Sequence, residues 1–110
     1  MRMWNVNPKI MCSKHLRGEH LEMHMFVGSI NKGKSIKGYL DGLVQVDNII
    51  SRHDELAHEM SLRGMNHQSP LDDFTYVGHN GHVTEESLDI LTDRCPECMK
   101  RYIKFHNGEL

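Results

Sequence analysis

The sequence predicts an all-α protein, a compact single domain of three principal helices joined by long loops. Two segments carry apolar residues at steps of three and four, the spacing of one face of a helix. A third segment opens with a threonine followed by acidic residues, which is typical of a helix start. A chain of 110 residues has room for one modest core. We therefore expect one domain over residues 1–110.

The first helix is expected over residues 8–30. Asn7 is a suitable N-cap, and Pro8 at the first helical position loses no hydrogen bond. The residues that should form its buried stripe are Leu16, His20, Met23, Val27 and Ile30. Residues 28–42 follow as an exposed, basic and glycine-rich connection.

The second helix should begin at Asp47 or Asn48 and end at Arg63, because Gly64 suits a left-handed C-terminal cap. Its inward-facing residues should be Ile49, Leu56 and Met60. The preceding residues 43–46 fit either a short strand or an extended lead-in to the helix.

Residues 65–82 are expected to form a loop because they are rich in Asn, Asp, Gly and Pro. The third helix should start after Thr84, continue past Leu91 and be disturbed near Pro96. Residues 99–105 should then form a final basic and aromatic turn or short helix.

Composition limits the classes of partner. The net charge is −2 and the pI is near 6.5, so the chain as a whole is not attracted to nucleic acid or to an anionic membrane. A polyanion must therefore be bound by a local basic patch. We expect no membrane association and a cytoplasmic protein, in the host cytoplasm if a phage encodes it, because apolar runs of spanning length and a signal-peptide pattern are both missing.

One face of the first helix should carry His15, Glu19 and Glu22, which lie at positions i, i+4 and i+7. Two close carboxylates disfavour double ionisation, so such a face suits a general acid or base. A solvated polar face is the alternative.

His20 and His24 also have a spacing that can chelate a metal, but packing or surface roles fit them as well.

Cys95 and Cys98 form a two-cysteine knuckle of the kind that binds zinc. Cys12 and one of the nine histidines would complete a structural zinc site and tie the C-terminal segment to the start of the first helix. Unligated thiols and a redox dithiol are the alternatives. Structural disulfides are disfavoured by the odd number of cysteines.

Two basic clusters are candidates for contact with nucleic acid. The residues of these clusters are Lys32, Lys34, Lys37, Lys100, Arg101 and Lys104. Tyr102 and Phe105 are interleaved with the second cluster and could stack on bases. Solvated surface charge is the alternative interpretation of both clusters.

The segment "KHLRGEHLEMHMFVGSI" resembles the first helix of the phage pyrimidine-dimer DNA glycosylases of the endonuclease V type. "RHDELAHEMSLRGMN" is similar to a later helix of that family, and "GLVQV" resembles the glycine-led segment before it. Together these blocks cover about residues 1–67, whereas residues 68–110 match nothing in the phage enzyme. The resemblance implies an all-α, endonuclease V-like fold, a combined glycosylase and abasic-site lyase, and no cofactor required for catalysis.

In that family, the terminal α-amine attacks C1′ of the damaged nucleotide, a Schiff base forms, and β-elimination cuts the strand. Carried over by position, the nucleophile is the amine of Met1 and the essential glutamate is Glu22. An α-amino group has a pKa of about 7.7–8.0, so a useful fraction is neutral and nucleophilic at physiological pH. Arg2 is bulky enough to disfavour removal of Met1, which keeps the amine in register.

The resemblance places Arg2, Lys14, His15 and Glu19 among the residues that line the site or bind DNA. It departs from the family at Leu21 and Met25, which replace two arginines. A lesion other than the pyrimidine dimer, or a bare abasic site, is therefore an alternative substrate. The expected partner is damaged double-stranded DNA, bound by a monomer. The alternative function is a non-catalytic helical module that binds nucleic acid or protein and is stabilised by zinc.

Overall fold

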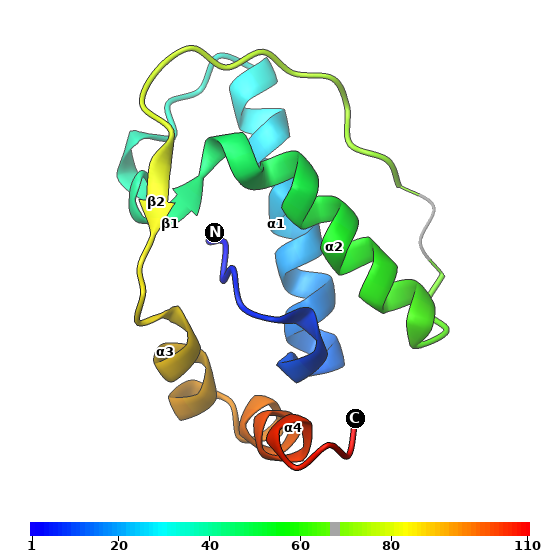
Figure 1. Ribbon diagram of the computed structural model, residues 1–110. Helices are drawn as coiled ribbons and strands as arrows, with labels where there is room; N and C mark the ends of the chain where they lie inside the picture. Colours follow the sequence, from blue (N-terminus) through cyan, green and yellow to red (C-terminus); the bar gives the residue numbers. More distant parts are fainter. Residues whose placement is uncertain (67–68) are drawn as a thin grey trace.

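The computed structural model describes residues 1–66 and 69–110 (Figure 1). Within these residues the α-helices are α1 (Ser13–Asn31), α2 (Ile49–Leu62), α3 (Ser87–Arg94) and α4 (Pro96–His106). An antiparallel pair of strands is formed by β1 (Asp41–Gln45) and β2 (Gly81–Val83). The predicted all-α fold of three principal helices is therefore wrong, because the structure has four α-helices and a sheet, although 56% of it is helical.

The predicted first helix is divided into two. Pro8–Ile10 forms a short 3-10 helix, with Asn7 as its N-cap, and the backbone at Met11 is extended. A new helix, α1, then begins after Cys12, whose sulfur accepts a hydrogen bond from the backbone N–H of His15. The buried stripe is confirmed for four of its five residues, and Ile30 is half-buried.

The second helix matches its prediction closely. α2 begins after Asn48 and ends before Arg63, and Gly64 adopts a positive φ of 76°. Ile49, Leu56 and Met60 are buried as expected. The local signals of periodicity and capping are strong here, and the packing of α2 against α1 agrees with them.

The predicted third helix is also two helices. Pro96 does not merely disturb a helix but occupies the first turn of α4, whose N-cap is Cys95. A missing backbone N–H costs nothing at that position. The chain therefore turns between α3 and α4, and residues 99–105 belong to a full helix of 11 residues.

The short strand that was one of two alternatives for residues 43–46 is confirmed as part of β1. The sheet was not predicted because β2 has only three residues and pairs with a strand about 40 positions earlier. The predicted loop over residues 65–82 includes residues 67 and 68, which lie outside the described residues, and it ends in β2. Gly81 has a positive φ of 74°, and a Cβ there would lie 2.5 Å from the carbonyl oxygen of Val44. The close approach of the two strands thus requires glycine at this position.

The two longest helices, α1 and α2, pack against each other, and the sheet, α3 and α4 are arranged around them. In Figure 1, α1 and α2 lie side by side, the sheet lies near the C-terminal half of α1, and α3 and α4 lie at the other end of the molecule. The N-terminal segment runs along the middle of α1, between these two ends. In the described part of the chain, no helix combines the length and apolar character needed to cross a bilayer.

Candidate functional site

The N-terminal segment is held in place next to α1. The backbone N–H of Met3 donates to the carbonyl oxygen of Leu43 in β1 at 2.7 Å. The side chain of Met3 is fully buried, and Trp4 is 5% exposed. Because the chain is anchored at residues 3 and 4, the amine of Met1 is only two residues from a fixed point. Met1 itself is half-buried and packs against the core.

Glu22 faces this N-terminal segment from α1 and is half-buried. Burial raises the pKa of Glu22, and the neighbouring charge of Glu19 acts in the same direction. A hydrogen bond from the backbone N–H of Arg2 and the positive charges of the terminal amine and of Arg2 act against the rise. The structure thus places the terminal amine and the carboxylate of Glu22 in one electrostatic environment. A carboxyl group with a raised pKa holds its proton more readily, which suits a general acid or base.

Arg2 lies beside this pair and is fixed by an aromatic ring and a hydroxyl group. Its guanidinium carbon lies 3.7 Å from the ring centroid of Trp4, and Nη2 donates to Ser87 Oγ at 2.6 Å. Burial, followed by the positive charge of Arg94, lowers the pKa of Arg2. Its Nε is buried and has no hydrogen-bond partner among the described residues. The sequence prediction named Arg2 but missed Trp4 and Ser87, which position it.

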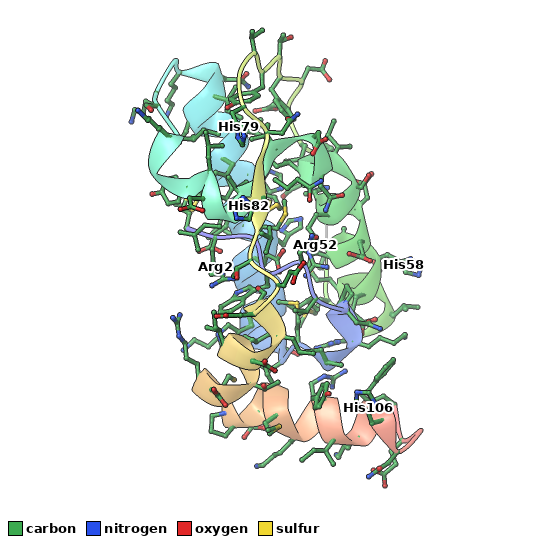
Figure 2. All side chains as sticks on the ribbon, turned by 60° about the vertical axis from the view of Figure 1, so that its left-hand side comes forward. Arg2, Arg52, His58, His79, His82 and His106 are labelled. Atoms are coloured by element: carbon green, nitrogen blue, oxygen red, sulfur yellow. The ribbon has the colours of Figure 1, made fainter. Side chains whose placement is uncertain are left out.

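Glu19, by contrast, is not available for chemistry. Its carboxylate oxygens accept hydrogen bonds from Arg52 Nε at 2.6 Å and Nη2 at 2.8 Å. Both side chains are almost completely buried, with exposed fractions of 1% for Arg52 and 0% for Glu19. Figure 2 shows Arg52 in the middle of the molecule, next to α2. Glu19 therefore links α1 to α2, and its charge reaches Glu22 only through space.

His15 contacts cysteines and does not share the environment of Glu22. Its Nδ1 lies 3.2 Å from Cys12 Sγ and 3.7 Å from Cys98 Sγ, and its ring makes an edge contact with Trp4. Burial, followed by the positive charges of Lys14 and Arg94, lowers the pKa of His15, which favours the neutral imidazole. The structure thus groups His15 with Cys12, Cys95 and Cys98.

The predicted basic residues lie at both ends of the molecule. Lys32, Lys34 and Lys37 are exposed and follow the C-terminal end of α1. Lys14, Lys100 and Arg101 lie at the opposite end, where they line a hollow of about 680 Å³ with Lys104. Arg101 Nε also donates to the carbonyl oxygen of Lys9 at 2.9 Å. In Figure 1 the N-terminus lies between α4 and the segment that follows α1.

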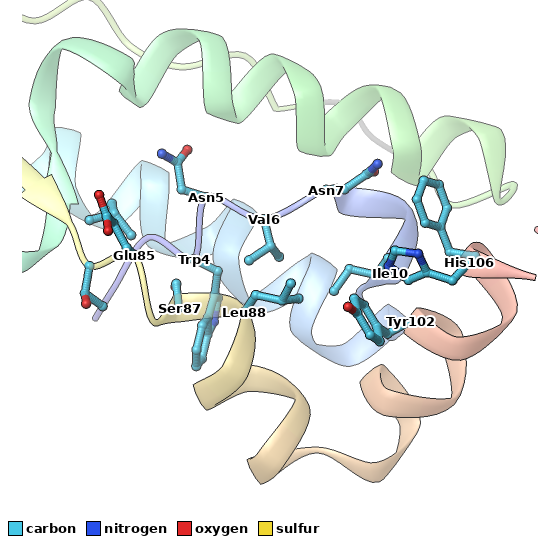
Figure 3. Close-up of a pocket in the computed structure, with 13 residues that line it drawn as sticks. Trp4, Asn5, Val6, Asn7, Ile10, Glu85, Ser87, Leu88, Tyr102 and His106 are labelled. Atoms are coloured by element: carbon cyan, nitrogen blue, oxygen red, sulfur yellow. The ribbon is translucent and has the colours of Figure 1, made fainter.

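An apolar cleft of about 400 Å³ adjoins Arg2 (Figure 3). Its walls come from the N-terminal segment, the start of α3 and the face of α4 that carries Tyr102 and Phe105. Trp4 and Ser87 line the cleft and also hold Arg2, whereas neither Met1 nor Glu22 is among the described lining residues. The cleft can accept a flat apolar group next to Arg2, but Met1 and Glu22 do not line it.

Three histidines form a second cluster between α1 and α2. The Nε2 atoms of His20 and His53 are 3.1 Å apart, and the ring of His24 lies 4.9 Å from each of the other two rings. His53 Nδ1 lies 2.9 Å from Asp54 Oδ1. The sequence indicated the pair on α1 but could not add His53, which is 33 residues away from His20 in the chain.

One comparison with known proteins identifies the family of this chain. A family model described as pyrimidine dimer DNA glycosylase matches residues 1–73. No curated protein and no solved structure gives a match. The matched segment contains the N-terminal segment, α1, β1 and α2, and thus Met1, Arg2, Glu22 and Arg52. It ends before β2, α3 and α4.

Proposed function

The chain belongs to the pyrimidine dimer DNA glycosylase family, and on that basis we propose that it removes a damaged base and then cuts the strand, with the amine of Met1 as nucleophile. The observation that carries this proposal is that Glu22 lies close enough to the N-terminus to accept a hydrogen bond from the backbone N–H of Arg2 and to feel the charge of the terminal amine, while burial raises its pKa. The anchoring of Met3 to β1 supports it, because it holds the N-terminal segment beside α1.

The first half of the proposed reaction transfers the sugar from the base to the protein. The neutral amine forms a bond to C1′ while the bond between C1′ and the damaged base breaks, and the base leaves with the electron pair. The proton that the amine loses balances the charge of the departing base. Glu22 then protonates the ring oxygen, the sugar ring opens, and a protonated Schiff base forms between C1′ and the Met1 nitrogen.

The second half cuts the strand. A carboxylate removes a proton from C2′, a double bond forms between C2′ and C3′, and the 3′ phosphate leaves with the electrons of the C3′–O bond. Glu22 is the carboxylate that we assign to this step. Water finally hydrolyses the Schiff base and restores the amine. Each step uses groups of this chain and water, so the proposal requires no cofactor for catalysis.

Arg2 and the basic clusters are proposed to bind the DNA. Arg2 has a guanidinium that is pre-oriented by Trp4 and Ser87, and its positive charge acts on Glu22. Such a group suits a phosphate near the reacting sugar. Lys32, Lys34 and Lys37 at one end, and the cluster on α4 at the other, would contact the flanking backbone.

We propose that the substrate is a lesion that the protein can bind without the two family arginines on α1. Leu21 and Met25 are 59% and 46% exposed, in positions where the family resemblance leads us to expect arginines. These side chains offer apolar contact and no bond to phosphate. A bare abasic site fits this surface as well as a pyrimidine dimer does, and both belong in the assay.

The test is borohydride trapping on duplexes that carry an abasic site, a pyrimidine dimer or no lesion. Borohydride reduces a Schiff base, so the proposal predicts a covalent adduct with a damaged duplex and none with the intact one. Glu22→Gln should alter the adduct yield, whereas Glu109→Gln, at an exposed carboxylate near the C-terminus, should not. One extra residue before Met1 should abolish trapping. An unchanged adduct in the extended protein would exclude Met1, and no adduct with any duplex would favour a non-catalytic binding module.

A further inference from the structure

Four side chains from the two ends of the sequence meet at a place that the proposed reaction does not use. Cys12 and His15 come from the start of α1, and Cys95 and Cys98 come from the start of α4. The sulfur atoms and one imidazole nitrogen all lie within 4.8 Å of one another. Two residues of this four-residue cluster, Cys95 and Cys98, lie outside residues 1–73. The family match therefore does not account for the cluster.

The distances fit a tetrahedral metal site. Ligands at about 2.3 Å (sulfur) and about 2.0 Å (nitrogen) from a zinc ion lie roughly 3.8 Å apart for two sulfurs and roughly 3.5 Å apart for sulfur and nitrogen. Cys12 Sγ lies 3.8 Å from Cys95 Sγ and 3.2 Å from His15 Nδ1. Cys98 Sγ lies 3.7 Å from the same nitrogen. These three separations are close to the ones that a zinc ion requires, and all four ligand atoms lie within 4.8 Å of one another.

The backbone around the cluster is arranged to stabilise thiolates. Cys12 and Cys95 are the N-caps of α1 and α4, and each sulfur accepts a hydrogen bond from the backbone N–H three residues later, at 3.4 Å. The backbone N–H of Cys12 donates to Cys98 Sγ at 3.3 Å. Two helix N-termini therefore direct their partial positive charge at the sulfurs. Both ligand pairs have the same spacing, with two residues between ligands, and both use the same cap geometry.

A disulfide does not account for the arrangement. All three cysteines are free. One disulfide would use two of the sulfurs and leave the third next to His15 with no function. An imidazole close to three sulfurs is instead a ligand set for a metal ion, since His and Cys are the ligands that zinc prefers.

We propose that Cys12, His15, Cys95 and Cys98 bind one structural zinc ion. Four protein ligands fill a tetrahedral shell and leave no open position for water, so the ion stabilises the fold and takes no part in the DNA chemistry. Binding releases the protons of the three thiols, and His15 binds as a neutral imidazole. The zinc ion joins α4 to the start of α1 and fixes the end of the molecule that carries Lys14, Lys100 and Arg101. His15 is then a zinc ligand and not a residue that lines the reaction site.

The first experiment uses the wild-type protein, purified under reducing conditions without chelator from medium that contains zinc. Elemental analysis should give one zinc per chain. Replacement by cobalt should produce the thiolate-to-cobalt charge-transfer band and the strong visible bands of a tetrahedral site. Mass spectrometry should show the three cysteines protected from iodoacetamide until a chelator is added. Less than a tenth of a zinc per chain after reconstitution, or a cobalt spectrum without thiolate bands, would overturn the proposal.

The second experiment assigns the ligands with matched variants. Cys98→Ser and His15→Gln should each lower zinc affinity by at least tenfold in a competition assay with a chromophoric chelator. His58→Gln is the matched control, because His58 is exposed on α2 and points away from the molecule (Figure 2). Unchanged affinity in both ligand variants would overturn the assignment. Affinity lost in His53→Gln but kept in Cys98→Ser would place the metal at the three-histidine cluster instead.

Discussion

Arg52 and Glu19 form a bidentate ion pair inside the protein, with hydrogen bonds of 2.6 and 2.8 Å between α2 and α1. Arg52 also donates to the carbonyl oxygen of Val6 at 2.7 Å and to Glu55 at 2.6 Å. One guanidinium therefore joins both long helices and the N-terminal segment that carries Met1. The pair belongs to the framework that positions the proposed nucleophile.

Removing Arg52 should destabilise the protein strongly. Arg52→Met leaves the carboxylate of Glu19 buried without its partner, and the free energy of unfolding should fall by about 3–5 kcal/mol. Urea denaturation followed by circular dichroism measures this change. Glu55→Gln is the control, since 55% of the Glu55 side chain is exposed, and it should change stability by less than about 1 kcal/mol. A small loss in Arg52→Met would contradict the framework role.

Glu22→Gln should lower activity and raise stability. Loss of the acid–base group should slow strand cleavage by roughly 100- to 10,000-fold. Burial raises the pKa of Glu22 in the folded state, so the folded protein binds this proton more tightly than the unfolded chain does. The free energy of unfolding therefore falls as the pH rises from the ordinary pKa of glutamate to the raised pKa of Glu22. Above both pKa values, the ionised carboxylate still destabilises the folded protein.

The variant lacks this titration, so the comparison with wild type is best made across pH. Thermal unfolding at pH 4 should differ little between the two proteins, and at pH 8 Glu22→Gln should have the higher Tm. A lower Tm for the variant at pH 8 would show that the carboxylate is a net stabilising contact. That result would contradict the electrostatic basis of the proposed site.

Capping residues and apolar spacing predicted those helices whose ends are determined by residues close in sequence. Asn48 precedes α2 and Gly64 follows it with a positive φ, as expected from the sequence. Contacts between distant residues were not predictable in this way. The pairing of Gly81 with Gln45, and of Arg52 with Glu19, joins positions more than 30 residues apart, and periodicity carries no information about such partners. This is why the sheet was missed.

The candidate site was predictable only in part, because spacing along the chain shows which residues share a helix face but not which distant residues they contact. Spacing on one helix placed His15, Glu19 and Glu22 on a common face, but it could not show that each contacts a different distant group. Glu19 binds Arg52, His15 contacts Cys98, and Glu22 accepts a hydrogen bond from the backbone N–H of Arg2. The link between Met1 and Glu22 came from family resemblance and not from spacing, because the two residues lie on separate segments.

Gly81→Ala should destabilise the sheet through both strain and collision. The residue has a positive φ, which costs roughly 1–2 kcal/mol for a residue with a Cβ, and the new atom would lie 2.5 Å from the Val44 carbonyl oxygen. Gly64→Ala is the matched control, because its φ is 76° but a Cβ there meets nothing within 4 Å. We expect Gly81→Ala to lose more stability than Gly64→Ala in urea denaturation. Equal losses would mean that β1 and β2 separate easily.

The two basic clusters should contribute separately to DNA affinity. The chain has a net charge of −2, so binding must depend on local groups, and each phosphate contact that is lost should reduce the slope of log K against log salt by about 0.9. The triple variant Lys32→Gln, Lys34→Gln, Lys37→Gln should therefore lower the slope by up to about 2.7. The double variant Lys100→Gln, Lys104→Gln should lower it by up to about 1.8. Fluorescence anisotropy on an abasic-site duplex measures both.

Lys9→Gln is the control for these variants, because Lys9 already pairs with Glu59 at 3.6 Å. If both cluster variants change the slope, DNA contacts both ends of the molecule, as expected if it passes the N-terminus that lies between them in Figure 1. If only the triple variant does so, α4 does not touch DNA, and the C-terminal helices act in stability alone. An unchanged slope in both would show that neither cluster binds phosphate, and the DNA path proposed over Glu22 would then be wrong.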